Sequence, residues 1–239
     1  LVALTLNVRN RWGNPVYGLT RDNFTIVEDS ARIPAVSVEY LKDRTPSASF
    51  VLCVDRSMSN SGYHNEIPWV SEFILKKMKK NDRLKVLNFN DDYWTGNDFD
   101  WSRRRALHAL RKREYGKGNN FGRVLYNAIG DLVPEVSRRG VVVVTDGSVS
   151  EDSFTTYTDD NIIDFANSHY IPVYFIAFRE PADVLKKIAK NTGGAVYRAS
   201  QLDGLRSIYD SIRQGEEYRY ILVYSTFKMK SLKGWWSDI

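Results

Sequence analysis

A short apolar segment, Phe50–Val54, followed at once by alternating polar residues, constrains the fold of this chain more than any other feature. An uninterrupted apolar run of this length is typical of a strand buried on both faces, as the central strand of a parallel sheet is. Asp55, Ser57 and Ser59 then alternate, so an extended chain would point one carboxylate and two hydroxyls to the same side. Because open α/β sheets bind ligands at this carboxyl edge, the pattern predicts a site there.

Two interpretations of these polar side chains stay open at this point. Oxygen-only groups suit a hard cation, and Mg²⁺ in particular accepts a few protein oxygens and keeps several waters. Alternatively, Ser57 or Ser59 only caps the helix that follows the strand.

Strands and helices alternate from Phe50 onwards, which predicts an α/β fold with a doubly wound, mostly parallel sheet. The clearest second strand is Val141–Val144, four consecutive valines that lead to Asp146. Further strands are expected at Leu84–Phe89, Val173–Phe178 and Val196, and helices at Ile67–Met78, Ala106–Leu110, Val124–Leu132, Ile162–Ala166, Leu185–Ala189 and Leu202–Ile212. The acidic and aromatic stretch Asp91–Trp101 is expected to be a packed strand edge rather than a binding surface.

The two ends of the chain have a different pattern. Residues 1–46 contain three expected strands with no helix among them, and Tyr218–Tyr224 alternates in the same way. Trp235 and Trp236 begin what we interpret as one more strand. We therefore expect residues 1–46 and 217–239 to form a small split β-sandwich, into which an α/β domain at residues 47–216 is inserted.

Composition and motifs limit the classes of function. The chain has 34 basic and 29 acidic residues, and this mild excess lies on expected amphipathic helices, so we expect no nucleic-acid partner. No eighteen-residue apolar run occurs, so no membrane span is expected. Cys53 is expected to be a core side chain, and the three histidines lack the spacing of a zinc site. With no P-loop and no nucleophile elbow, the chain is not expected to be an enzyme.

The order of the motifs resembles the von Willebrand factor A domain family. The residues that carry this resemblance are Asp55, Ser57 and Ser59, then Leu125–Ile129, then Val143–Gly147. Other stretches resemble a bacterial branch of the family that has flanking β-sandwich strands, namely Gly13–Leu19, Asn23–Phe24, Val27–Asp29, Ile171–Ile176, Ile188–Gly194 and Tyr218–Tyr224. The resemblance implies an extracytoplasmic protein, whether secreted, periplasmic or on the cell surface, that acts in protein binding or cell adhesion.

The resemblance also implies a metal-ion-dependent adhesion site, in which Mg²⁺ or Mn²⁺ binds a protein partner. Ser57 and Ser59 would be direct ligands, Asp55 and Asp146 would act largely through water, and an acidic side chain of the partner would complete the coordination. The family's threonine ligand corresponds to Arg123, whose guanidinium cannot coordinate a cation.

Arg123 leaves two arrangements open. Either it points away and Asn119 or Asn120 supplies an oxygen in its place, or it fills the site, pairs with Asp55 or Asp146, and makes cation binding weak or absent.

The expected function is thus a non-enzymatic protein-binding module. The alternative is a substrate-recruiting or sensing domain of a larger enzyme or chelatase-like assembly. A third interpretation is a role in assembly, in which the edge of the sandwich accepts a strand from a neighbour.

Overall fold

The computed structural model describes residues 1–6, 8, 10, 16–42, 47–100, 102–135, 137–214 and 218–226. The chain divides into two compact units, Pro46–Gly215 on the one hand and Leu1–Thr45 with Glu216–Ile239 on the other. Each boundary differs by one residue from the expected limits of 1–46, 47–216 and 217–239. The strand expected at Trp235 and Trp236 lies outside the described residues.

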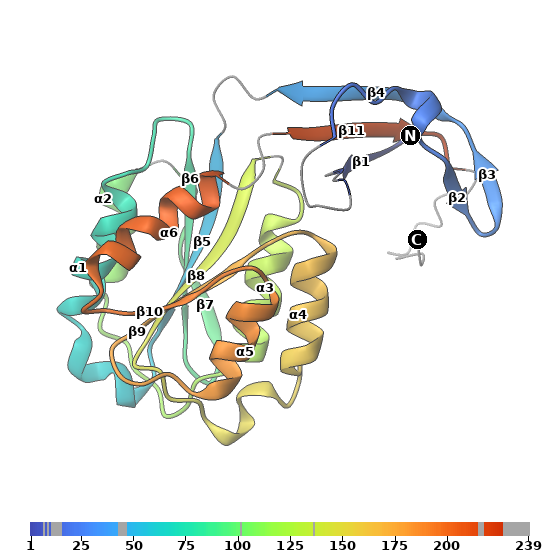
Figure 1. Cartoon of the computed structure of the whole chain (residues 1–239). Coiled ribbons are helices and arrows are strands. Elements are labelled where there is room, and N and C mark those ends of the chain that lie inside the picture. Colours follow the sequence, from blue (N-terminus) through green and yellow to red (C-terminus); the bar gives the residue numbers. More distant parts are fainter. Residues whose placement is uncertain are drawn as a thin grey trace. The chain divides into compact units, whose positions relative to one another are not determined.

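The larger unit is built on a six-stranded sheet with the order β10-β9-β8-β5-β6-β7 (Figure 1). Its strands are β5 (Ala48–Asp55), β6 (Arg83–Phe89), β7 (Tyr93–Asp100), β8 (Arg138–Thr145), β9 (Val173–Ala177) and β10 (Val196–Arg198). All neighbours are parallel except β6 and β7, which form an antiparallel edge. The expected doubly wound, mostly parallel sheet is confirmed.

Helices cover both faces of this sheet. One apolar cluster packs α1 (Glu66–Leu75), α2 (Arg103–Leu110) and α6 (Leu202–Gln214) on the sheet, and a second packs α3 (Phe121–Leu132), α4 (Asp159–Ser168) and α5 (Asp183–Asn191). Phe50 and Leu52 belong to the first cluster, and Val51 and Cys53 to the second, because successive side chains of β5 point to opposite faces. Every residue of β5 is buried, so the strand that carries Asp55 is held rigidly.

The strand order places a topological switch point between β5 and β8. From β5 the chain passes to β6 on one side, whereas β8 pairs with β5 on the other side. Asp55 is the last residue of β5, and Asp146 directly follows β8. Both carboxylates therefore lie where the helices on either side diverge, which is the position at which open α/β sheets bind ligands.

The smaller unit joins the two ends of the chain in one sheet. Strand β11 (Tyr218–Tyr224) lies between β1 (Val2–Leu6) and β4 (Ala35–Lys42) and is antiparallel to both. A hairpin of β2 (Ile26–Glu28) and β3 (Ala31–Ile33) packs its two buried isoleucines against Leu222 and Tyr224. A short 3₁₀ helix, η1 (Arg21–Asn23), precedes the hairpin.

Tyr220 anchors this unit. Its ring is buried between those of Phe24 and Tyr40, with centroids 5.8 Å and 5.2 Å away. Its hydroxyl donates to the carbonyl of Val16 over 3.0 Å and accepts from the N–H of Leu19 over 3.1 Å. One side chain thus ties the segment before η1 to the central strand β11.

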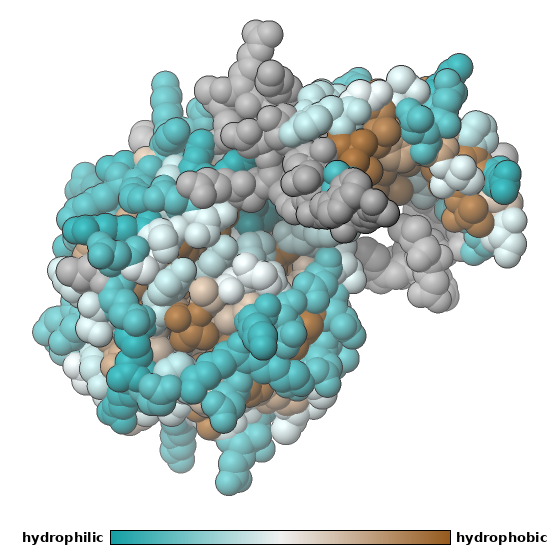
Figure 2. All heavy atoms as spheres, viewed as in Figure 1, coloured by the Kyte–Doolittle hydropathy of each residue, from teal (hydrophilic) through white to brown (hydrophobic). Residues whose placement is uncertain are grey.

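On the face drawn in Figure 2, hydrophilic residues cover most of the α/β unit, and apolar residues occur there in small groups. None of the helices in the part of the chain that the structure describes is both long and apolar enough to cross a membrane.

Candidate functional site

Asp55 forms the buried floor of the site. Its Oδ1 accepts from the N–H of Ser57 over 2.8 Å, and its Oδ2 accepts from the hydroxyl of Thr145 over 2.7 Å and from Asn119 Nδ2 over 3.3 Å. Burial raises the pKa of Asp55 from its usual value of 3.8 to about 6, although the hydrogen bonds from Ser57 and Thr145 lower it.

The two hydroxyls of the first motif lie side by side, with Ser57 Oγ 3.1 Å from Ser59 Oγ. Ser57 precedes the 3₁₀ helix η2 (Met58–Tyr63), and its side chain makes no capping hydrogen bond there. The N-cap residue of α1 is Asn65. The alternative in which Ser57 or Ser59 only caps the following helix is therefore wrong.

Asp146 presents the second carboxylate, at the end of β8. Its Oδ1 accepts from the backbone N–H of Ser148 over 3.0 Å and from the Ser148 hydroxyl over 2.7 Å. Its Oδ2 is buried and has no hydrogen-bond partner among the described residues. Gly147 makes this turn possible, because its φ is +99° and a Cβ atom would lie 3.0 Å from the carbonyl oxygen of Glu180.

Asn119 reaches the site through its amino group and not through its oxygen. Asn119 Oδ1 accepts from the N–H of Ser150 over 2.8 Å, and Nδ2 donates to the carbonyl of Ser148 over 2.9 Å. Since a backbone N–H can only donate and a carbonyl can only accept, these two bonds fix the orientation of the amide. The expectation that Asn119 or Asn120 supplies a ligand oxygen is thus wrong for Asn119.

Asn120 and Arg123 both lie at the start of α3, and their side chains have partners outside the group formed by Asp55, Ser57, Ser59 and Asp146. Asn120 is the N-cap residue, and its Oδ1 accepts from the N–H of Arg123 over 3.0 Å. Arg123 Nη1 lies 3.3 Å from Asp92 Oδ1, and its guanidinium lies 5.6 Å from the centroid of the Tyr93 ring. The arrangement in which Arg123 fills the site is therefore wrong, because Asp92, in the turn before β7, offers it a carboxylate and Tyr93, the first residue of β7, offers it an aromatic face.

Arg56, which follows Asp55, is fully buried, although nothing in the sequence pattern singles it out. Its Nε donates to Asn88 Oδ1 over 2.8 Å, and its Nη2 donates to the carbonyl of Leu110 over 2.9 Å at the end of α2. Burial lowers the pKa of this guanidinium below its ordinary value. In addition, the backbone of Gly116 accepts from Met58 N–H over 2.7 Å and donates to Arg56 O over 2.9 Å. The segment that begins at Asp55 is thus bonded to the last residue of α2 and to Gly116 in the loop that follows α2.

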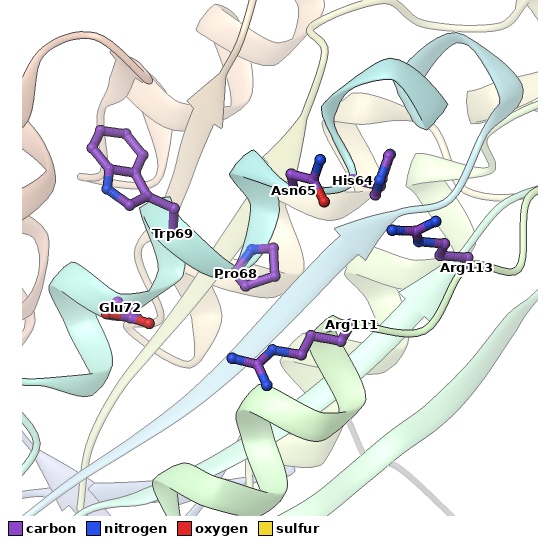
Figure 3. A pocket seen from close by; sticks show the side chains of 7 residues that line it. All are labelled: His64, Asn65, Pro68, Trp69, Glu72, Arg111 and Arg113. Carbon is purple, nitrogen blue, oxygen red and sulfur yellow. The ribbon is translucent and has the colours of Figure 1, made fainter.

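That loop forms one wall of a pocket of about 340 Å³. Figure 3 shows the side chains that line it: Arg111 and Arg113 from the end of α2 and the loop beyond it, and His64, Asn65, Pro68, Trp69 and Glu72 from α1 and the turn before it. Arg111 and Arg113 form no ion pair with any described residue, whereas Glu72 pairs with Lys76 over 2.7 Å. The pocket therefore has a net positive charge.

The oxygens at the switch point fit a hard divalent cation. Ligands at neighbouring corners of a Mg²⁺ octahedron lie about 3 Å apart when each bond is about 2.1 Å long. Ser57 Oγ and Ser59 Oγ meet this requirement, and Asp146 Oδ2 offers a buried acceptor that no described residue uses. No group of three or more His, Cys, Asp or Glu residues in the described ranges is arranged to hold a metal, so a zinc-type cluster is not found there.

Sequence reasoning missed two hydroxyl residues at this site, Thr145 and Ser148. Thr145 orients Asp55, and Ser148 Oγ lies 3.2 Å from Ser59 Oγ. The sequence does contain a signal for Ser148, because Asp146, Ser148 and Ser150 repeat the spacing of Asp55, Ser57 and Ser59.

No protein-family model and no curated protein matches the sequence. Several solved structures are nevertheless similar in fold. An aerotolerance-related membrane protein from Bacteroides fragilis has a TM-score of 0.57 at 17% identity, with 70% of this chain and 99% of that chain covered. A von Willebrand factor type A protein from Catenulispora acidiphila has a TM-score of 0.55 at 15% identity, with 80% of this chain and 52% of that chain covered.

A third similar structure is proximal thread matrix protein 1 from the mussel byssus, with a zinc-occupied metal-ion-dependent adhesion site. Its TM-score is 0.56 at 14% identity, with 79% of this chain and 50% of that chain covered. At such low identity these likenesses establish the fold alone. The α/β unit of this chain therefore has the fold of a von Willebrand factor A domain.

Proposed function

We propose that this chain is a non-enzymatic protein-binding module, which engages an acidic side chain of a partner through Mg²⁺ or Mn²⁺ at the carboxyl edge of its central sheet. The observation that carries this proposal is a chain of contacts at the switch point, which leads from Ser57 and Ser59 through the hydroxyl of Ser148 to Asp146. Asp146 Oδ2 is buried there and has no partner among the described residues. A buried carboxylate oxygen is costly to leave unpaired, and a cation would satisfy it.

In this proposal each side chain has a distinct part. A bound divalent cation supplies a Lewis-acid centre that accepts a carboxylate of the partner. Ser57 and Ser59 present neutral hydroxyl oxygens, while Asp146 presents Oδ2. Asp55 holds the N–H of Ser57 and thereby fixes the turn that aims both hydroxyls.

The hydrogen bonds of Ser57 and Ser59 favour binding over nucleophilic catalysis. Among the described residues, these hydroxyls contact each other, the carboxylate of Asp55 and the hydroxyl of Ser148, and no imidazole. Asp55 already accepts from the N–H of Ser57, from Thr145 and from Asn119, so it is poorly placed to act as the base that a serine nucleophile needs, and this arrangement supports a module without hydrolytic activity.

The positive pocket beside the motif supports an acidic partner. Arg111 and Arg113 lie in the segment whose end, Gly116, is bonded to the backbone of Arg56 and Met58. A partner with further acidic groups would also pair with these two guanidinium groups, which no described carboxylate neutralises. Such complementary charge accelerates association and disfavours basic partners.

The similar structures support a location outside the cytoplasm. One is of a membrane protein and another is of a byssal thread matrix protein. The latter has zinc at its adhesion site, which supports a divalent cation at the corresponding edge of this fold.

Selection from a random peptide library displayed on phage tests the proposal, because it needs no identified partner. The chain is immobilised in Mg²⁺, and bound phage are eluted with EDTA. We expect the selected peptides to share an Asp or Glu, and we expect the Asp146→Ala variant to select none of them. Peptides without an acidic residue, or phage that EDTA does not release, would contradict the proposal.

A further inference from the structure

We propose that Ser148 is the third hydroxyl ligand of the cation site, and that a second Asp-x-Ser-x-Ser segment supplies it from the neighbouring strand. This inference rests on the proposed cation site and adds a ligand to it. It also explains how the site dispenses with the threonine that Arg123 replaces.

The two segments share the spacing of their polar residues and one backbone hydrogen bond. Asp55, Ser57 and Ser59 follow β5, and Asp146, Ser148 and Ser150 follow β8. In each segment the aspartate Oδ1 accepts from the N–H of the serine two residues later, over 2.8 Å and 3.0 Å. Since β5 and β8 are parallel neighbours, both turns open at the same edge of the sheet.

The three hydroxyls form a continuous row. Ser57 Oγ lies 3.1 Å from Ser59 Oγ, which lies 3.2 Å from Ser148 Oγ. Both separations are close to the distance of about 3 Å between neighbouring ligands of a Mg²⁺ octahedron. Ser148 is therefore placed to coordinate the same ion as the two serines of the first motif.

The hydroxyl of Ser148 donates its proton to a neighbouring carboxylate, so its oxygen remains available to bind a cation. Ser148 Oγ donates to Asp146 Oδ1 over 2.7 Å. A hydroxyl that donates its proton keeps two lone pairs, so the oxygen can still bind a cation. Asp146 Oδ2, on the same carboxylate, stays without a partner among the described residues.

The other candidates for this ligand position face away or present hydrogen. Asn119 turns its Nδ2 towards Asp55 and towards the carbonyl of Ser148, and an amino group with hydrogens cannot coordinate a cation. Arg123 pairs with Asp92. The bond from Asn119 to the carbonyl of Ser148 instead holds the second turn in position.

Titration of the EDTA-treated chain with Mn²⁺ in a calorimeter tests the inference. We expect Ser59→Ala and Ser148→Ala each to weaken Mn²⁺ binding about tenfold or more. Ser61→Ala is the matched control, because Ser61 lies in η2, is half-buried, and donates to the carbonyl of Met58 over 2.7 Å. Its affinity should stay within about twofold of the wild type. Melting temperatures in EDTA identify any variant that has lost its fold.

A second variant separates direct coordination from support of the turn. Ser148→Cys replaces a hard oxygen with a soft sulfur, so Mn²⁺ should bind more weakly and Cd²⁺ should bind more tightly. A thiolate-to-cadmium absorption band should then appear that the wild type lacks, because its one cysteine, Cys53, is buried in β5. Ser148→Thr keeps the hydroxyl and should restore Mn²⁺ binding.

The outcomes separate this inference from the proposed function. If Ser59→Ala loses Mn²⁺ while Ser148→Ala binds as the wild type does, the site exists and Ser148 is not its ligand. If Ser148→Cys shows no cadmium–thiolate band, direct coordination is likewise excluded. If the wild type binds no Mn²⁺ at all, the proposed function and this inference fail together.

Discussion

The hydroxyl of Thr145, the last residue of β8, donates to the carboxylate of Asp55, the last residue of β5, over 2.7 Å. This bond joins the two strands at the point where the site begins. The bond itself favours the charged form of Asp55, but burial disfavours that form more strongly, and this net effect has a measurable consequence for stability.

Asp55 should make the metal-free chain less stable as the pH rises. Its pKa is about 6 in the folded chain and 3.8 ordinarily, so between these values the folded state binds more protons than the unfolded state. Stability relative to the Asp55→Asn variant should therefore be greatest below about pH 4, fall between about pH 4 and 6, and level off above, with a total loss of about 3 kcal/mol. Urea unfolding of both proteins in EDTA, at several pH values across this range, measures the difference in their free energies of unfolding. Parallel curves for the two proteins would contradict the raised pKa.

Arg123→Thr should leave cation affinity nearly unchanged, although it restores the residue type that the family has. The guanidinium pairs with Asp92 and lies over Tyr93, so its removal does not alter the positions of Ser57, Ser59 or Asp146. We expect the Mn²⁺ dissociation constant to change less than about threefold, as for a partly exposed surface pair. Calorimetry with Arg123→Ala as the matched variant tests this, and a gain of tenfold specific to threonine would show that position 123 can reach the cation.

Reversing the charge of the pocket should weaken the binding of acidic peptides. Arg113→Glu and Arg111→Glu each place a carboxylate where a pocket guanidinium lies, so an EDTA-released peptide should bind more slowly to either variant, with a smaller difference at high salt. Lys190→Glu, on α5, makes the same charge change on an exposed residue outside the pocket and is the control. Surface plasmon resonance at low and high salt gives the rates. Equal effects from all three variants would mean that only net charge matters.

Residues 46–215 should fold without the rest of the chain. Both apolar clusters of the α/β unit consist only of residues from this range, so removing the other unit takes no side chain from either core. We expect a cooperative urea transition and the α/β circular dichroism of the whole chain. A fragment without a cooperative transition would show that the two units fold as one.

Tyr220→Phe should destabilise the smaller unit selectively. The change removes the hydroxyl that bonds to Val16 and Leu19 but keeps the ring between Phe24 and Tyr40. The expected loss is about 1–2 kcal/mol, because two backbone groups lose their partner. Hydrogen exchange should speed up in β1 and β4 and stay unchanged in β5, which lies in the other unit. Equal acceleration in both units would contradict this.

Apolar runs predicted the central strands of the sheet well, because a strand that is buried on both faces needs apolar side chains at every position. Phe50–Val54 and Val141–Val144 are such runs, and they form the middle of neighbouring strands β5 and β8. Their ends therefore located Asp55, Ser57, Ser59 and Asp146 as well.

The details of the site depend on contacts that local pattern does not contain. Asn119 is oriented by Ser148 and Ser150, about thirty residues further along the chain, and Arg123 by Asp92, at a similar distance before it. A polar side chain with several partners within reach takes its direction from tertiary structure. The repeat of the Asp-x-Ser-x-Ser spacing at Asp146 is nonetheless visible in the sequence, and it marks Ser148 as a candidate site residue.

The way in which the α/β unit is inserted determines how this chain responds to mechanical force. The chain leaves β4 at Lys42 and returns at Tyr218, and these two residues are paired across the sheet. Val2, near the start of β1, is likewise paired with Tyr224 at the end of β11. A force applied at Val2 and Tyr224 would break the hydrogen bonds between β1 and β11 one after another, starting at this pair. It would load the pairing of β4 with β11, which acts as a clamp, only afterwards. Until that clamp opens, the α/β unit would carry no tension, so the proposed binding site would be insulated from strain along the chain.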